Sequence, residues 1–159
     1  MPKRSAGLLL YRVSDGVVEV LIAHPGGPFW AGKEDGVWSI PKGEYADAED
    51  PWAAAQREFV EEVGLAVPDG PRIDLGSLKQ PGGKIVTAFA VRADLDITGA
   101  HSNTVEVEWP RGSGQIKVFP EIDRVGWFPL PQARVKLLAG QRPFLDRLMA
   151  HLAVPGESS

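Results

Sequence analysis

The sequence of 159 residues contains no cysteine, which excludes disulfide bonds, a thiolate nucleophile and a zinc–thiolate site. It also lacks a long hydrophobic run: the start leads only into the short apolar segment 6–11, so we expect neither a secretory signal nor a membrane span. A cytoplasmic location is the default expectation. The histidines are scattered without metal-ligand spacing and are expected to be incidental. Neither a Gly-x-Ser-x-Gly elbow nor a Walker phosphate loop occurs.

Positive charge is also scarce, because 17 Lys and Arg stand against 21 Asp and Glu, for a net charge of −4. This balance argues against stable, sequence-independent binding of nucleic acid, and at first sight against phosphate binding. However, seven acidic residues and one basic residue lie between Glu44 and Glu62, so this stretch carries −6 and the rest of the chain +2. The acidity is local. It predicts a divalent-metal site that, once loaded, favours a polyanionic substrate.

Glycine and proline are plentiful, at 18 and 14 residues, and they separate many short elements. No internal repeat or linker divides the chain, so we expect one domain over residues 1–159. Hydrophobic periodicity and turn signals predict strands at 7–12, 17–24, 36–40, 73–79, 84–93, 104–109 and 125–128, and helices at 50–63, from Pro131, and at 143–152. This order predicts an α/β (α+β) fold, a mixed β-sheet with helices packed on it.

The helix at 50–63 has the clearest signals, with Asp50 as N-cap, Pro51 at the first helical position and Gly64 at the end. At 100° per residue, its glutamates 58, 61 and 62 form one stripe beside the stripe of core residues. Like charges at this spacing destabilise a helix, and the dipole disfavours anions in its C-terminal half. A solvated acidic face is the ordinary explanation of such a stripe. A hard cation such as Mg²⁺ or Mn²⁺, which takes oxygen ligands, would relieve the repulsion.

The residues around this helix carry a family signature. Gly43, Glu49 and the run Arg57-Glu58-Phe59-Val60-Glu61-Glu62-Val63-Gly64-Leu65 match every defined position of the Nudix box, G-x5-E-x7-R-E-U-x-E-E-x-G-U, where U is a bulky apolar residue. Nine constrained positions would coincide by chance in roughly one window in 10⁹. The sequence resembles the Nudix hydrolases, in particular bacterial members with a Trp-x-x-Pro-Lys-Gly lead-in, which the dinucleoside polyphosphate hydrolases share. The surrounding strands and the closing Trp127-Phe128-Pro129-Leu130 segment extend the likeness to the whole Nudix fold.

This resemblance implies hydrolysis of a nucleoside diphosphate linked to another group, X, by attack of water on phosphorus, with Mg²⁺ or Mn²⁺ as cofactor. It also implies roles for individual residues. The metal ligands would be Glu58, Glu61, Glu62 and the backbone carbonyl of Lys42. Arg57 would orient the neighbouring carboxylates, Glu49 would support the loop and the helix, and Gly43 and Gly64 would be structural.

The family resemblance leaves the general base open between Glu58 and a carboxylate outside the box. We favour Glu121 as the outside carboxylate, because it shortly precedes the strand at Trp127, where related hydrolases often carry such a glutamate. Glu106 and Glu108 are rivals, although they alternate with Val107 and can simply form the solvent face of a strand.

Phosphate and nucleobase recognition would need further groups. Lys42, Lys84 and Arg111 are candidates for binding pyrophosphate, each weighed against an ordinary surface charge. Phe29 and Trp30 could stack on a nucleobase, or could simply anchor their loop.

The leading hypothesis is a metal-dependent pyrophosphohydrolase of a small nucleotide, such as a dinucleoside polyphosphate. ADP-ribose and nucleoside triphosphates stay open as substrates, while RNA 5′ ends are disfavoured by the lack of a basic stripe. The alternative of another class is a Nudix-fold module that senses nucleotides without turnover, which would not need so crowded a carboxylate stripe. The sequence leaves monomer and homodimer open.

Overall fold

A computed structural model describes residues 3–153 of the chain; the remaining residues, 1–2 and 154–159, which the sequence assigns to the same domain, lie outside the described part. The strands are β1 (Arg4–Ser14), β2 (Val17–Pro25), β3 (Lys42–Glu44), β4 (Arg72–Lys79), β5 (Ile85–Arg92), β6 (Thr104–Glu108), β7 (Ile116–Pro120) and β8 (Ile122–Pro129). The helices are α1 (Pro51–Val63), α2 (Leu130–Lys136), the 3₁₀ turn η1 (Ala139–Gln141) and α3 (Arg142–Leu152).

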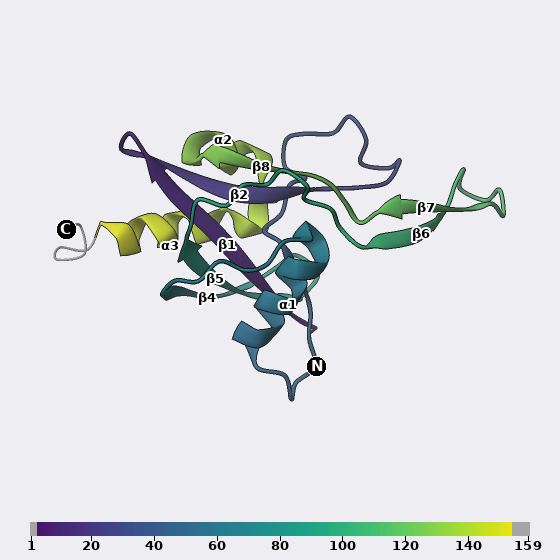
Figure 1. Cartoon of the computed structure of the whole chain (residues 1–159). Coiled ribbons are helices and arrows are strands. Elements are labelled where there is room, and N and C mark those ends of the chain that lie inside the picture. Colours follow the sequence, from purple (N-terminus) through teal and green to yellow (C-terminus); the bar gives the residue numbers. More distant parts are fainter. Residues whose placement is uncertain (1–2, 154–159) are drawn as a thin grey trace.

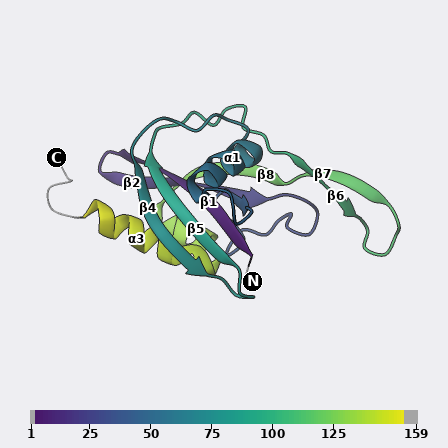
Figure 2. The same ribbon diagram turned by 90° about the horizontal axis from the view of Figure 1, so that it is seen from below.

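The main sheet has six strands in the order β4-β5-β1-β2-β8, with β3 pairing separately with β1 (Figure 1). The pair β1–β5 is parallel and the other pairs are antiparallel, so the sheet is mixed. This confirms the expected fold class. Helix α1 lies on one face of the sheet and α3 on the other, as the view in Figure 2 shows from below.

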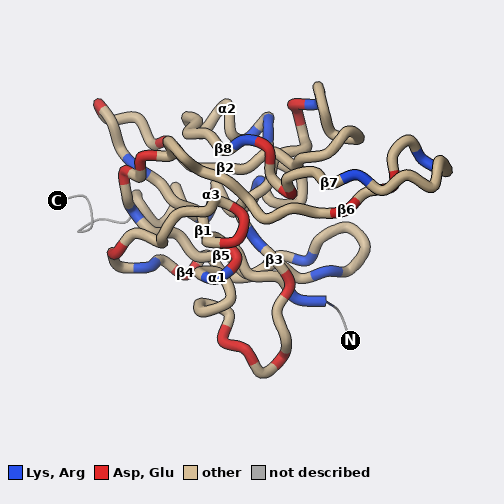
Figure 3. The backbone as a smooth tube through the Cα atoms, turned by 45° about the vertical axis from the view of Figure 1, so that its right-hand side comes forward, with Lys and Arg blue, Asp and Glu red and all other residues tan. Residues whose placement is uncertain are grey.

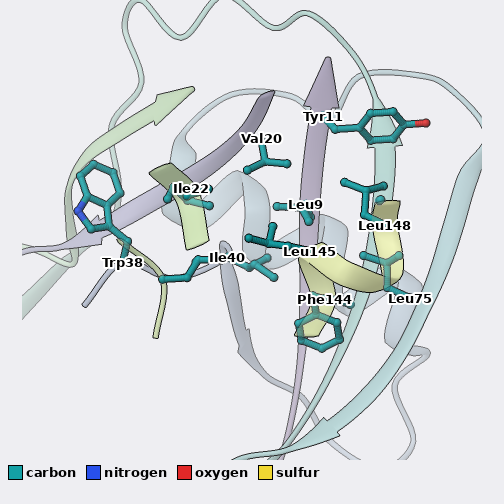
Figure 4. Packing of buried hydrophobic residues seen from close by; sticks show 14 of the residues in the cluster. Leu9, Tyr11, Val20, Ile22, Trp38, Ile40, Leu75, Phe144, Leu145 and Leu148 are labelled. Carbon is teal, nitrogen blue, oxygen red and sulfur yellow. The ribbon is translucent and has the colours of Figure 1, made fainter. Parts of the chain in front are cut away.

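Strand β1 lies at the centre of this sandwich and has apolar side chains on both faces. Its Leu8 and Leu10 pack with Phe59 of α1, while Leu9 packs with Phe144 of α3 in the second core (Figure 4). All of these side chains are fully buried. Because both faces are covered, the strand is a continuous apolar run without the alternation of a half-exposed strand.

Helix α1 forms as its sequence predicts. The side chain of Asp50 accepts a hydrogen bond from the backbone N–H of Ala53 (3.0 Å), and Pro51 occupies the first turn. Gly64 ends the helix in the left-handed conformation, at φ 75°, and its N–H donates to the carbonyl of Val60 (2.8 Å). The helix and its ends are therefore confirmed.

One strand prediction was wrong and one strand was missed. Residues 36–37 form a turn, and Trp38 and Ser39 make only isolated bridges to Leu137 and Ala23. The strand of this region is β3, which follows Pro41 and pairs with the start of β1. Strand β7 was not predicted; it pairs with β6 in a second, two-stranded sheet that projects away from the body of the molecule (Figures 1 and 2).

Candidate active site

The glutamates of α1 lie in a crowded and partly dry environment. Glu62 is only 8% exposed, and its carboxylate accepts a hydrogen bond from the backbone N–H of Lys42 (3.2 Å). Burial, helped by the negative charge of Glu121, raises the pKa of Glu62 to about 8. Burial and the neighbouring Glu61 raise the pKa of Glu58 to about 7. Such carboxylates need a positive charge to ionise at neutral pH without cost.

Arg57 supplies part of that charge and fixes its neighbours. Its guanidinium donates to both carboxylate oxygens of Glu49, at 3.0 and 2.9 Å, and so ties the loop before the helix to the helix itself. It also reaches Glu58 at 3.2 Å and Glu61 at 3.5 Å. The guanidinium of Arg57 therefore contacts three carboxylates at once.

The two glycines of the box stand where a side chain would collide with the site or its surroundings. A Cβ at Gly43 would lie 2.1 Å from the carboxylate carbon of Glu58, so the missing side chain leaves room for that carboxylate. A Cβ at Gly64 would lie 2.2 Å from the carbonyl oxygen of His101, in addition to the strain of its positive φ.

Glu121 is the outside carboxylate that the fold brings to this stripe. It lies between β7 and β8, and its charge acts on both Glu62 and Lys42. The backbone holds it there: its N–H donates to Asn103 and its carbonyl accepts from Gly26, at 2.9 and 2.8 Å. The N–H of Asn103 in turn donates to the carbonyl of Glu61 on α1 (2.9 Å), so the segment is linked directly to the helix.

The rival glutamates have other surroundings. Both lie on β6, in the projecting hairpin (Figure 1). The carboxylate of Glu108 accepts from the N–H groups of Gly112 and Gly114 and thereby closes the hairpin turn. Glu106 is exposed, as expected for the solvent face of a strand. Arg111 lies in the turn between β6 and β7, and Figure 2 shows this hairpin projecting away from α1. The structure therefore does not bring these residues together with the carboxylate stripe.

Lys42 and Lys84 do lie together. Both line one cavity of about 380 Å³ between β5 and the 3₁₀ turn, and Lys42 leads directly into the box. Burial and the positive charge of Lys84 lower the pKa of Lys42. Two ammonium groups held near each other favour an anionic ligand between them.

Phe29 and Trp30 lie in the loop between β2 and β3, with their rings edge to face at 4.8 Å. The ammonium of Lys33 lies over both rings, 4.0 Å from the centre of Phe29 and 5.5 Å from that of Trp30. Among residues 3–153, no hydrogen bond or ring contact links the two aromatic residues to α1.

His24 has structural contacts that were not predicted from the sequence. This residue is fully buried, with Nδ1 at 2.7 Å from a carboxylate oxygen of Asp123 and Nε2 at 2.6 Å from the carbonyl of Lys33. It thereby joins β2, β8 and the loop that carries Phe29 and Trp30. The sequence hint was its place at the end of an apolar strand, but its partner Asp123 is 99 residues away.

The carboxylate oxygens of the stripe are the ligands that a hard divalent cation prefers. Burial raises the pKa of Glu58 and Glu62, so a bound cation would supply the positive charge that their ionised forms lack. Within the described chain, however, no three His, Asp or Glu side chains form a ready set of ligands. The reason is visible in the contacts: Glu58 and Glu61 turn toward Arg57, and Glu62 bonds the backbone of Lys42. A cation would have to draw these side chains together.

Acidic and basic residues lie close together at this site. Figure 3 shows the acidic stretch of α1 in red and the basic stretches near β3 beside it in blue.

The chain matches the profile of the NUDIX domain over residues 1–151, so it belongs to the Nudix family. The family and the complete box define the class of protein, a Nudix-type hydrolase of phosphoanhydride bonds. Comparison with curated proteins finds no match. In the described part of the chain, no helix has the length and apolar character needed to cross a bilayer.

Several solved structures share the fold. The NUDIX domain of Shewanella oneidensis NrtR, in complex with ADP ribose, has a TM-score of 0.67 at 13% identity, covering 96% of this chain and 90% of that one. A mutT/nudix family protein from Listeria innocua has a TM-score of 0.63 at 21% identity, covering 96% and 95%. The Ap4A hydrolase of C. elegans has a TM-score of 0.58 at 22% identity, covering 96% and 100%. At these identities the likeness establishes the fold.

Proposed function

We propose that the protein is a metal-dependent pyrophosphohydrolase that cleaves a nucleoside diphosphate linked to another group, with a dinucleoside polyphosphate as the leading substrate. The observation that carries the proposal is the mutually repelling pair of Glu62, which is buried, and Glu58, which is partly buried, beside Lys42. A site that only binds nucleotides does not need anions concentrated where the phosphates would lie. The proposal includes a small nucleotide as partner and a cytoplasmic site of action.

In this proposal Glu58, Glu61, Glu62 and the carbonyl of Lys42 hold Mg²⁺ or Mn²⁺. The metal, when bound, would neutralise phosphate charge and acidify a water molecule. Arg57 fixes the orientation of the carboxylates through its hydrogen bonds to Glu49 and Glu58. Water attacks one phosphorus, its proton passes to a carboxylate, and the anhydride P–O bond breaks with its electron pair on the leaving phosphate oxygen.

Glu121 is our choice for the carboxylate that takes this proton, with Glu58 as the alternative. We expect Glu121→Gln to lower kcat at least about tenfold, as loss of a general base does. Glu106→Gln and Glu108→Gln are matched controls from the projecting hairpin, and each should stay within about twofold of wild type. A large loss in either control with a normal Glu121→Gln would reverse the assignment.

Metal binding should also stabilise the fold, because a cation relieves the repulsion along α1. We expect Mg²⁺ at about tenfold above its Kd to raise Tm by about 3 °C, measured by thermal unfolding after treatment with a chelator. In Glu62→Gln the shift should shrink. An unchanged Tm for the wild type with both Mg²⁺ and Mn²⁺ at millimolar concentration, with and without a non-hydrolysable nucleotide, would contradict the metal site.

The deciding experiment is a nucleotide panel with identification of the products. Dinucleoside polyphosphates, ADP-ribose and nucleoside triphosphates are each incubated with Mg²⁺ or Mn²⁺, and the position of cleavage reports which phosphorus water attacks. If the wild type hydrolyses none of these nucleotides while Glu62→Gln binds them equally well, the protein is a module that senses nucleotides and not a hydrolase.

A further inference from the structure

Two neighbouring cavities at one end of the sheet are lined by lysines. The larger, of about 710 Å³, has Lys3, Lys79 and Lys84 in its wall. The smaller, of about 380 Å³, has Lys42 and again Lys84. The two cavities share Lys84 and Pro81, and no Asp or Glu lines either of them. In a chain with a net charge of −4, four lysines in two adjoining cavities are a marked local excess of positive charge.

Four separate parts of the sequence meet here because of the sheet topology. Lys3 directly precedes β1, and its carbonyl accepts a hydrogen bond from the N–H of Ile85 at the start of β5 (2.9 Å). Lys79 ends β4 and Lys84 precedes β5, on the two sides of the turn that joins these strands. Lys42 begins β3, which pairs with β1 on its other side. Figure 3 shows the blue stretches next to β3 and the N-terminal end of β1.

The positive charge is only partly balanced within the protein. Glu44 forms an ion pair with Lys84, at 3.1 Å, and the charges of Lys3 and Lys42 act on the same carboxylate. Among residues 3–153, no hydrogen bond or ion pair is formed by the ammonium of Lys42 or of Lys79. Glu62 and Glu121 also act on Lys42, so the capacity for an anion of more than one charge lies mainly at the outer lysines, Lys3 and Lys79.

The position of the smaller cavity relates this charge to the proposed chemistry. Lys42 has its backbone N–H on Glu62 and its side chain in that cavity. From there the wall continues through Lys84 to Lys79 and Lys3 in the larger cavity. The lysines therefore lead away from the carboxylate stripe, in the direction that the part of a substrate beyond the scissile bond could take.

We propose that Lys42, Lys84, Lys79 and Lys3 form a polyphosphate track, so that the group X carries further phosphates beyond the cleaved pyrophosphate. The substrate class is then a phosphate chain of more than two units, and a nucleoside diphosphate joined to an uncharged sugar would leave the outer lysines unused. This inference rests on the proposed function for the place where the chain is cut.

The outer end of the track is tested with the double variant Lys3→Ala/Lys79→Ala. We expect it to raise KM for a dinucleoside tetraphosphate about five- to tenfold with little change in kcat, since each lost contact with a charged group weakens binding by a modest factor. The ratio of kcat/KM for the tetraphosphate to that for ADP-ribose should fall by the same factor. Arg92→Ala, at the opposite end of β5, removes an exposed cation outside both cavities and should leave the ratio unchanged.

Binding of inorganic tripolyphosphate in the presence of a chelator tests the track without turnover. Calorimetry should show binding to the wild type and to Arg92→Ala, and at least about fivefold weaker binding to the double variant. Faster hydrolysis of a dinucleoside tetraphosphate than of tripolyphosphate assigns the track to a nucleotide's chain, and the reverse assigns it to a free phosphate chain. Equal tripolyphosphate affinity and an unchanged substrate ratio in the double variant would overturn the track. Lysine-dependent binding of tripolyphosphate with no hydrolysis of any nucleotide would overturn the proposed function and leave the track standing.

Discussion

Glu58→Gln and Glu62→Gln are each expected to lower turnover by at least about 10²-fold, the scale of losing a principal electrostatic group in an active site. Both carboxylates are largely withdrawn from water, and burial opposes their ionisation. Holding two such carboxylates together lowers the stability of the fold, which is expected only where they have a function. An amide has nearly the same shape but cannot bind a cation with the strength of a carboxylate.

The substitution at position 62 should leave the fold intact. The Oε1 atom of glutamine can still accept the hydrogen bond that the N–H of Lys42 donates to Glu62. The raised pKa of Glu62 means that folding at neutral pH costs free energy at this carboxyl, so glutamine should raise Tm of the metal-free protein. The measurement is kcat on the best substrate of the panel, with thermal unfolding of each variant alongside, and Glu106→Gln serves as the exposed control. Rates near wild type in both variants would rule out the metal site on α1.

The parts of the site that the sequence predicts well are those formed by local interactions. The helix α1, its N-cap Asp50 and its end at Gly64 depend on residues within one or two turns. The stripe of glutamates follows from helical periodicity alone. The contact of Arg57 with Glu49 spans only eight positions, and the box motif contains both residues.

The parts that could not be predicted depend on contacts distant in sequence. His24 meets Asp123 only because β2 pairs with β8. The polyphosphate track requires the parallel pairing of β1 with β5, which no local pattern reveals. Arg111 is a candidate for binding pyrophosphate by residue type, yet the hairpin of β6 and β7 carries it away from α1. Residue type alone indicates the chemistry of a side chain, whereas topology decides which side chains meet.

Gly43→Ala is expected to lower kcat about 10²-fold while changing the free energy of unfolding by less than about 1 kcal/mol. The new Cβ would lie 2.1 Å from the carboxylate carbon of Glu58 and 2.2 and 2.4 Å from its oxygens, distances that no real contact allows. The obstacle is the end of a flexible side chain, so Glu58 can turn away while β3 keeps its pairing with β1. The φ of Gly43 is not among the positive values, so alanine brings no backbone strain of that kind.

The Gly43→Ala variant tests whether activity needs the carboxylate of Glu58 at its observed position, since the carboxylate itself is retained. In Gly43→Ala all three glutamates of the stripe are retained, but Glu58 can no longer rest against the backbone of β3. Gly82→Ala is not a suitable control because its φ is 89°, whereas Ala53→Gly changes a residue of α1 outside the carboxylate stripe and tests general softening of the helix. The measurements are kcat and Mg²⁺ affinity together with Tm. A fully active Gly43→Ala would mean that Glu58 works equally well from another position, and that the close approach to Gly43 is a matter of packing alone.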